Sequence, residues 1–340
     1  MAKNVAFFAD GTWDGPCQNS NVSRLYSAAA KIDGEQLTTY DPGVGTDGNP
    51  VDSILGGAFG VGIFGKIRQG YAAIAAQYAP GDHIFIFGFS RGAYTARSLA
   101  GMIAICGLPT INQNDPKCLD MAFEAYRNAS QRQMLLDTLN EGYRMDNAKI
   151  QLLGVWDTVG SLGIPAIFGG IDVCQYGFLD TSLHPDVLNA VQALAIDEQR
   201  LQFQPALWTS APAPGQSLAQ VWFAGVHCDV GGSYPADDGG FALSNITLNW
   251  VANYAKNCGL QFAPGAFPST SRLTDALATL HDSLTGLYSL TPHRRNIVDD
   301  SSLYESVQQR CATPASNYAP ENLHISGGQL AGGYSIVPYV

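Results

Sequence analysis

Residues 81–104 read GDHIFIFGFSRGAYTARSLAGMIA and pass from an apolar run through a glycine-rich turn to a stretch of small residues. The apolar run predicts a buried strand, and residues 93–104 predict a helix that packs closely on a sheet. Between them lies the pattern Gly88-Phe89-Ser90-Arg91-Gly92. A serine on such a sharp strand-to-helix turn exposes its hydroxyl, and the flanking glycines avoid a collision with the strained backbone. We interpret Ser90 as a nucleophile; the simpler alternative is a serine that only caps the helix.

The composition excludes several classes of protein. The chain has 340 residues, of which 46% are hydrophobic and 14% charged, so we expect a globular protein rather than a disordered one. Its net charge of −11 argues against a nucleic-acid partner and against a general attraction to anionic lipid, although a local contact with a membrane surface stays open. No apolar run is long enough to span a bilayer, and the N-terminus lacks a secretory signal. We expect a cytoplasmic protein; export without a cleaved signal is the open alternative.

No cofactor or metal is expected. The seven cysteines are scattered without a C-x-x-C pair, which indicates neither a disulfide framework nor a zinc site. The glycines of residues 54–65 lack the lysine of a phosphate-binding loop, so a packed loop is the simpler interpretation. The motif FADGT has Phe8 where phosphatases with an aspartate nucleophile carry that aspartate, which excludes this chemistry.

Six short apolar runs predict the strands of an α/β fold. Helix-like stretches separate several of them, as expected for a mostly parallel sheet with helices on both faces. The runs are Val5–Phe8, Leu37–Tyr40, His83–Phe87, Ile150–Trp156, Ala190–Ile196 and Gln220–Val226. We expect one α/β-hydrolase-like domain over residues 1–340, with cap-like insertions at about 110–148 and 161–189. Beyond about residue 262 the sequence shows few patterns that predict helices or strands.

Polar side chains follow nearly every predicted strand, at the edge where parallel sheets place their chemistry. A serine nucleophile needs a histidine base and an acid that orients it. His227 ends the run QVWFAGVH beside a glycine turn and is the preferred base, with His281 as a rival. Asp157 and Asp197 each close a strand between Ser90 and His227, and the residues alone do not separate them.

The oxyanion of the reaction needs two backbone donors. One is the N–H of Arg91, which follows the serine, and the second is expected from Gly11 or Thr12 in the loop after the first strand. Asp10 is expected to fix this loop rather than to react. Asp229 follows His227 closely and is kept as a supporting residue.

As an ordered set, six segments resemble the α/β-hydrolase domain family DUF2235, which includes the first class of type VI secretion lipase effectors. The matching segments are residues 8–13, 40–46, 81–97, 154–160, 195–200 and 222–232, within about residues 4–260. The resemblance implies a triad of Ser90, Asp157 and His227, so that Asp197 becomes structural. The larger secreted members add membrane-binding or delivery regions that we do not expect in this chain.

These observations lead to one expected function. We expect a serine hydrolase without a cofactor that cleaves carboxylic esters, of lipids or phospholipids in particular. Two alternatives stay open, an acyltransferase with the same triad and a binding module that keeps the fold without catalysis. The substrate is then a small-molecule or lipid ester, and the sequence predicts no oligomeric state.

Overall fold

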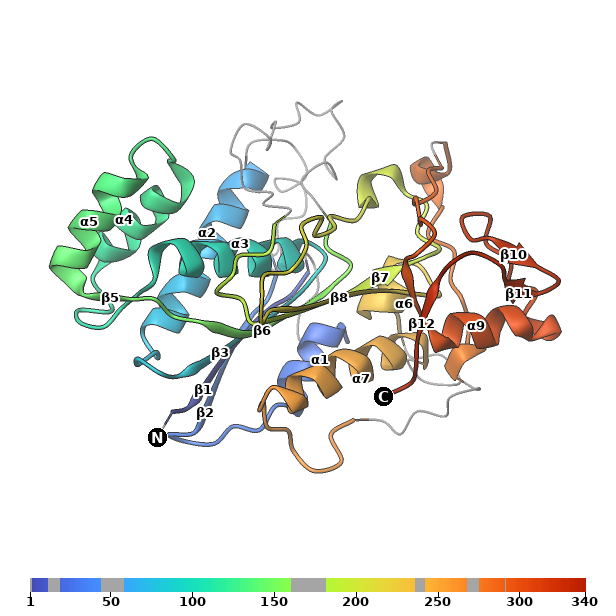
Figure 1. The fold of residues 1–340 in the computed structure, drawn as a ribbon, viewed down its shortest axis with the longest axis horizontal. Coiled ribbons are helices and arrows are strands. Elements are labelled where there is room, and N and C mark those ends of the chain that lie inside the picture. The colour runs from blue at the N-terminus through green and yellow to red at the C-terminus, as the bar shows by residue number, and fades with distance from the viewer. Residues whose placement is uncertain are drawn as a thin grey trace.

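A computed structural model describes residues 2–11, 19–43, 58–159, 182–235, 242–267, 275–290 and 292–340. Within these residues, eight strands form a central sheet in the order β12-β9-β8-β7-β6-β3-β1-β2, and all pairs are parallel (Figure 1). Its strands are β1 (Asn4–Ala9), β2 (Gln36–Asp41), β3 (His83–Phe89), β6 (Ile150–Trp156), β7 (Asn189–Ala195), β8 (Ser217–Phe223), β9 (Ser302–Tyr304) and β12 (Ser335–Val337). Two small antiparallel pairs join β4 (Leu108–Pro109) to β5 (Met145–Asp146) and β10 (Ile325–Ser326) to β11 (Gln329–Leu330).

Helices cover both faces of the sheet (Figure 1). The described helices are α1 (Asn21–Ala28), α2 (Ala58–Ala75), α3 (Arg91–Cys106), α4 (Pro116–Arg127), α5 (Arg132–Tyr143), α6 (His227–Gly231), α7 (Ala242–Asn257) and α9 (Glu305–Ala312). Short 3₁₀ turns span Leu201–Phe203, Gly286–Leu290 and Pro314–Ser316. One face packs on α2, α3 and α4, and the other packs on α1 and α7. Among the described residues, no helix combines the length and the apolar character needed to cross a bilayer.

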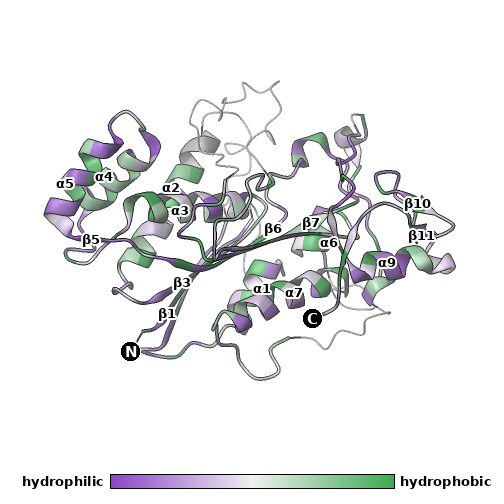
Figure 2. Ribbon diagram, viewed as in Figure 1, coloured by the Kyte–Doolittle hydropathy of each residue, from purple (hydrophilic) through white to green (hydrophobic). Residues whose placement is uncertain are grey.

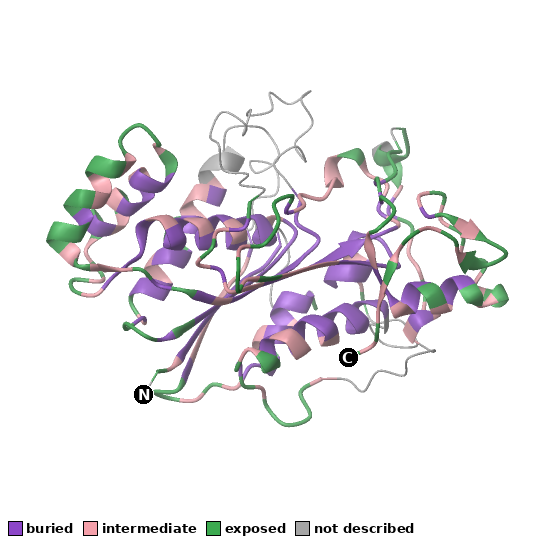
Figure 3. Ribbon diagram, in the orientation of Figure 1, coloured by how far each residue is buried: buried purple, intermediate pink, exposed green. Residues whose placement is uncertain are grey.

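All six predicted strands are present, as β1, β2, β3, β6, β7 and β8. Of these, β1, β3, β6 and β7 are buried almost throughout, which explains their near-continuous apolar sequence (Figure 3). Strand β8 is buried at its carboxyl end, and β2 forms the edge of the sheet beside β1 and is only partly buried. The sequence missed β9 and β12, which extend the sheet at one edge. Each has only three residues, so neither gives a readable pattern.

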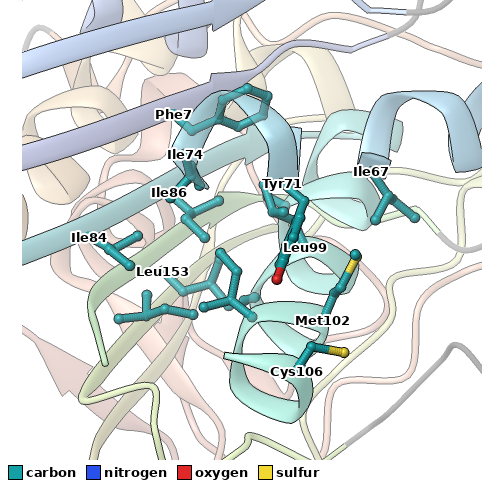
Figure 4. Packing of buried hydrophobic residues seen from close by; sticks show 14 of the residues in the cluster. Phe7, Ile67, Tyr71, Ile74, Ile84, Ile86, Leu99, Met102, Cys106 and Leu153 are labelled. Atoms are coloured by element: carbon teal, nitrogen blue, oxygen red, sulfur yellow. The ribbon is translucent and has the colours of Figure 1, made fainter. Parts of the chain in front are cut away.

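The core between the sheet and α2 and α3 is built from large apolar side chains. Ile84 and Ile86 project from β3 toward Tyr71 on α2 and Leu99 on α3 (Figure 4). Apolar residues continue along the inward faces of these helices, whereas polar residues gather on the outer surface of α4 and α5 (Figure 2). This layer gives α3 a rigid support, and α3 in turn begins at Arg91, directly after Ser90.

The insertion at 110–148 is helical, as predicted, but it does not cover the end of β3. Its helices α4 and α5 pack on each other, and α4 packs on α2 and α3. The Cys106 thiol at the far end of α3 lies against the Ala122 carbonyl on α4. The apolar face of α4 therefore extends the helical layer. Of the second expected cap, residues 160–181 lie outside the described residues.

The first turn of α3 lies in close contact with the end of β1. A Cβ atom on Gly92 would stand 2.2 Å from the Ala9 carbonyl oxygen and 2.4 Å from that of Asp10. Both neighbours are backbone atoms, which cannot rotate away. The glycine is therefore required by this approach of two elements.

We expect Gly92→Ala to lower the free energy of unfolding by about 3 kcal/mol, at the upper end for an added methylene, because the added methyl group must displace backbone. Gly65→Ala is the matched control. A Cβ at Gly65, within α2, meets no atom within 4 Å, so this change should stabilise the protein by roughly 0.5–1 kcal/mol. Urea unfolding of both variants measures the difference, and equal stabilities would contradict the close approach.

Candidate active site

Ser90 stands on a strained turn between β3 and α3. Its backbone has φ 57° and ψ −121°, a conformation that non-glycine residues rarely adopt. A Cβ on Gly88 would lie 2.4 Å from the Gly92 carbonyl oxygen, so the turn tolerates no side chain there. The Ser90 N–H donates to the Trp156 carbonyl at 3.1 Å, which fixes the turn against β6. Its side chain makes no capping hydrogen bond to α3, so the simple capping role does not apply.

Asp157 and His227 are joined by a short hydrogen bond. The Asp157 Oδ2 and His227 Nδ1 atoms are 2.6 Å apart, and both side chains are almost completely buried. Asp157 follows β6, the neighbour of β3, and its backbone also has a positive φ of 41°. His227 begins α6, just beyond the end of β8. Ser90 and Asp157, both with positive φ, thus occupy the ends of adjacent strands.

The imidazole of His227 lies against the residue that precedes Ser90. The ring centroids of His227 and Phe89 are 4.6 Å apart, and Phe203 contacts the imidazole edge-on at 5.0 Å. His227 Nε2 is buried and has no hydrogen-bond partner among the described residues. A buried polar atom without a partner costs free energy and calls for an explanation. With Nδ1 held by Asp157, Nε2 is the nitrogen left to exchange a proton.

Arg295 completes the surroundings of Asp157, and sequence reasoning missed it. Its two terminal nitrogens donate to the two carboxylate oxygens at 2.6 and 2.8 Å, and further to the carbonyls of Ala195 and Phe203. Burial would raise the pKa of Asp157, but the Arg295 charge and the His227 bond outweigh it and hold that pKa below its usual value. Arg295 lies 138 residues after Asp157 in a poorly patterned segment, and no sequence signal distinguishes it from its neighbour Arg294.

Glu198 is a second missed residue, and it holds the backbone of His227. Its Oε2 accepts the His227 N–H at 3.2 Å, while Arg200 donates to both carboxylate oxygens at 2.9 and 2.8 Å. The Ser283 hydroxyl adds a bond of 2.9 Å. Burial raises the pKa of Glu198, but the Arg200 contacts outweigh this and lower it to about 2. The sequence shows that polar residues follow this strand, but it does not show that Glu198 bonds the backbone of His227.

Asp197, the alternative acid, faces away from this group. Its Oδ2 accepts the Gly225 N–H at 2.6 Å and the Tyr318 hydroxyl at 2.9 Å. These contacts tie the end of β7 to the turn before His227 and to the C-terminal region. No described contact joins Asp197 to the His227 side chain.

The rival histidine, His281, belongs to a second pair with Asp229. The Nδ1 atom of His281 lies 2.5 Å from Asp229 Oδ1, and its ring stacks on Tyr234. Asp229 Oδ2 also accepts the N–H groups of Val226 and His281, at 3.0 and 3.1 Å. Asp229 therefore fixes the first turn of α6, which carries His227.

The residues expected around the oxyanion have distinct positions. The Asp10 carboxylate is buried and accepts bonds from the hydroxyls of Ser20 (2.5 Å) and Tyr40 (2.6 Å), which fix the loop after β1. Asp10 Oδ1 also accepts the Gly11 N–H at 2.8 Å, so that donor is already engaged and the expectation for Gly11 needs correction. Thr12 lies outside the described residues. Arg91 follows Ser90 at the start of α3, as the motif requires.

Within the described part of the chain, no three His, Cys, Asp or Glu side chains gather as metal ligands do. The polar groups near His227 are instead engaged with one another. The arrangement is suited to acid–base chemistry at a serine, which needs no bound group.

Comparison with known proteins identifies the family. Residues 3–254 match the model described as T6SS, Phospholipase effector Tle1-like, catalytic domain. An uncharacterized protein of Saccharomyces cerevisiae is 29% identical over 236 residues, which are 62% of this chain and 33% of that protein, so the chain spans about a third of its length. The crystal structure of an uncharacterized protein from Pseudomonas aeruginosa shares the fold, with a TM-score of 0.51 at 19% identity over 82% of this chain and 50% of that one.

A further similar structure is that of the Tle1 effector bound to the VgrG spike from the Type 6 secretion system. It has a TM-score of 0.47 at 16% identity and covers 85% of this chain and 78% of that one. The family match spans well over half of the sequence. The chain therefore belongs to the family of Tle1-like phospholipase effector catalytic domains of the type VI secretion system.

Proposed function

We propose that this protein hydrolyses the acyl esters of phospholipids, with Ser90 as nucleophile, His227 as base and Asp157 as the orienting acid. The observation that carries the proposal is the Asp157–His227 pair, whose unpartnered Nε2 lies in a ring in contact with Phe89, beside the strained turn of Ser90. Family membership supports a hydrolase. No Ser90–His227 hydrogen bond is made in the structure, and such bonds often tighten only when substrate is present.

The proposed reaction has two halves. The Ser90 oxygen adds to the ester carbonyl while His227 Nε2 takes the serine proton and then gives it to the departing alcohol. Water next loses a proton to Nε2 and adds to the acyl-serine, which releases the fatty acid and restores the serine. The Arg91 N–H, at the start of α3, is placed to stabilise the negative oxygen in both halves, aided by the helix dipole.

The choice of Asp157 over Asp197 rests on contacts and charge. Asp157 is bonded to the His227 side chain and has a lowered pKa, so it remains a carboxylate that stabilises the imidazolium formed in the reaction. Burial raises the pKa of Asp197 to about 6, and its oxygen bonds to backbone and tyrosine. Asp197 therefore acts as a structural link.

A cavity along α3 supports a phospholipid substrate. It has a volume of about 360 Å³, and its lining includes Tyr94, one helical turn after Ser90, although Ser90 and His227 themselves do not line it. Apolar and aromatic side chains, among them Leu153 and Trp208, line it together with Arg97 and Arg132. Its described lining contains three arginines and no carboxylate, in a chain with a net charge of −11. Such a lining suits an apolar ligand that carries a phosphate.

The first test is labelling with a fluorophosphonate probe, which reacts with activated serines. Wild type should be labelled, whereas Ser90→Ala should not, and His227→Ala should react at least about 10²-fold more slowly because the base is missing. Ser27→Ala is a control, since Ser27 is exposed on α1, which covers the other face of the sheet. Failure of the folded wild type to react would refute the activated serine.

The two aspartates should differ in turnover and in stability. Asp157→Asn should reduce turnover by about 10⁴-fold, because an amide holds the wrong imidazole tautomer, whereas Asp197→Asn should retain turnover. The raised pKa of Asp197 means that the folded state keeps a proton between about pH 4 and 6 that the unfolded state has released. Its stabilising contribution is therefore full below pH 4 and is lost as the pH rises through 6.

An asparagine at position 197 does not ionise, so it avoids this loss of stability with rising pH. Above pH 6, the free energy of unfolding of Asp197→Asn should therefore exceed that of wild type by roughly 1–3 kcal/mol. Urea unfolding at pH 4 and pH 8 measures the change, and ester hydrolysis measures turnover. An Asp197→Asn variant that is inactive, together with an active Asp157→Asn, would reverse the assignment.

The substrate is tested by comparing a phospholipid with a diacylglycerol of the same acyl chains in mixed micelles. Arg97→Met should raise KM for the phospholipid by roughly tenfold, because a charge-assisted contact to phosphate is lost, and leave KM for the neutral lipid nearly unchanged. Arg68→Met, on the neighbouring helix α2 and paired with the exposed Asp120, is the control. An equal effect of Arg97→Met on both lipids would show that the cavity does not select the phosphate.

A further inference from the structure

Three carboxylates surround His227, and each is held by a side chain from the segment 281–295. Asp157 bonds the imidazole, Glu198 bonds the backbone N–H of His227, and Asp229 fixes the first turn of α6. Their partners in the segment are Arg295, Ser283 and His281, respectively. This segment lies beyond residues 3–254, which carry the family match. The surroundings of the proposed base are therefore completed by the C-terminal part of the chain.

Within this segment, Arg295 places its positive charge against Asp157, the carboxylate that bonds the proposed base. Its guanidinium is about 1% exposed and makes four hydrogen bonds, two of them to Asp157. The planar fork of arginine matches the two oxygens of a carboxylate and fixes its plane. Ordinary orientation of a carboxylate requires only neutral donors, such as the Ala195 N–H that Asp157 also accepts at 3.1 Å. The added cation thus has an electrostatic effect beyond orientation.

We propose that Arg295 is a positioning residue that shields the imidazole of His227 from the negative charge of Asp157, and so limits how strongly that carboxylate favours the imidazolium. The proposal rests on the proposed function, because it concerns the base of that reaction. Arg295 acts through Asp157 and does not touch the substrate. It cancels most of the negative charge that would otherwise favour the imidazolium.

The sign of this effect follows from the buried charges. A carboxylate alone beside an imidazole favours protonation of the ring, by roughly 1–3 pH units when the two are in contact. A carboxylate already paired with a guanidinium presents almost no net charge, so it exerts much less of this effect. Among the described residues, the other charged or titratable groups around α6 are Asp197, Glu198 and Arg200 after β7, Cys228 and Asp229 on α6 itself, Tyr234 and His281. Glu198 is paired with Arg200, so Arg295 is the charge whose removal leaves Asp157 uncompensated.

The experiment follows the proton on His227 directly by NMR, with ¹³C-labelled histidine and six histidines to resolve. A His227→Asn variant assigns the signal. In Arg295→Gln, the pH at which His227 becomes protonated should rise by roughly one to two units relative to wild type. Arg294→Gln is the matched control: the neighbouring arginine is 54% exposed and paired with Glu321, so the same signal should not move.

A second pair of variants keeps the test decisive if Arg295→Gln does not fold. Asp157→Asn and Asp157→Asn/Arg295→Gln differ only in the guanidinium, and the double variant buries no unpaired charge. The His227 signal should titrate at a higher pH in the double variant than in Asp157→Asn. An unchanged titration in either pair would overturn the proposal.

The pH profile of kcat/KM adds a readout that a merely structural role would not move. In Arg295→Gln the acid limb should shift upward by the same amount as the NMR titration, with activity recovered at higher pH, and Arg295→Lys should restore most of the wild-type profile. A uniform loss at every pH would indicate a structural role and refute the proposal. Because the NMR titration requires no turnover, a protein that fails to react with the probe but shows the shift refutes the proposed function and leaves the electrostatic role of Arg295 intact.

Discussion

The buried negative charge of Asp157 is the constraint on which the rest of the site depends. A carboxylate with no exposure to water costs several kcal/mol unless charges and hydrogen bonds replace the lost hydration. Here Arg295 supplies the charge, and the Ala195 N–H and the His227 imidazole supply the remaining bonds. Each partner comes from a different part of the chain, so the carboxylate draws β6, β7, α6 and the C-terminal segment together. The buried carboxylate of Asp157 requires partners from all four parts, and these parts therefore meet around it.

The order of the strands in the sheet explains how residues far apart in the sequence come together at the site. From β3 the sheet continues through β6, β7 and β8, so successive chain segments become spatial neighbours. Ser90, Asp157, Glu198 and His227 follow these four strands in turn. His227 reaches back across the end of β7 to Asp157 because α6 turns it inward, and Glu198 after β7 holds the backbone of this turn.

Much of this was predictable from the sequence, for identifiable reasons. The strands β1, β3, β6 and β7 are buried on both faces, so their apolar runs stand out, and the polar residues that follow the predicted strands mark one edge of the sheet. The turn that carries Ser90 could be predicted because its strand, its glycines and its helix follow one another directly in the chain. The three-residue strands β9 and β12 leave no periodic pattern. The roles of Arg295 and Glu198 were not predictable, because an ion pair across 138 residues has no local signature, and the engagement of the Gly11 N–H by Asp10 depends on a loop conformation.

The late position of Arg295 has a consequence for the timing of folding. During synthesis the strands through β8 are made before Arg295, so a growing chain holds Asp157 without its cation. In that interval a closed site would contain an uncompensated buried carboxylate, which disfavours closure. Assembly of this edge of the sheet is therefore coupled to synthesis of the C-terminal part, and a nascent or truncated chain holds Ser90, Asp157 and His227 without the arrangement described above.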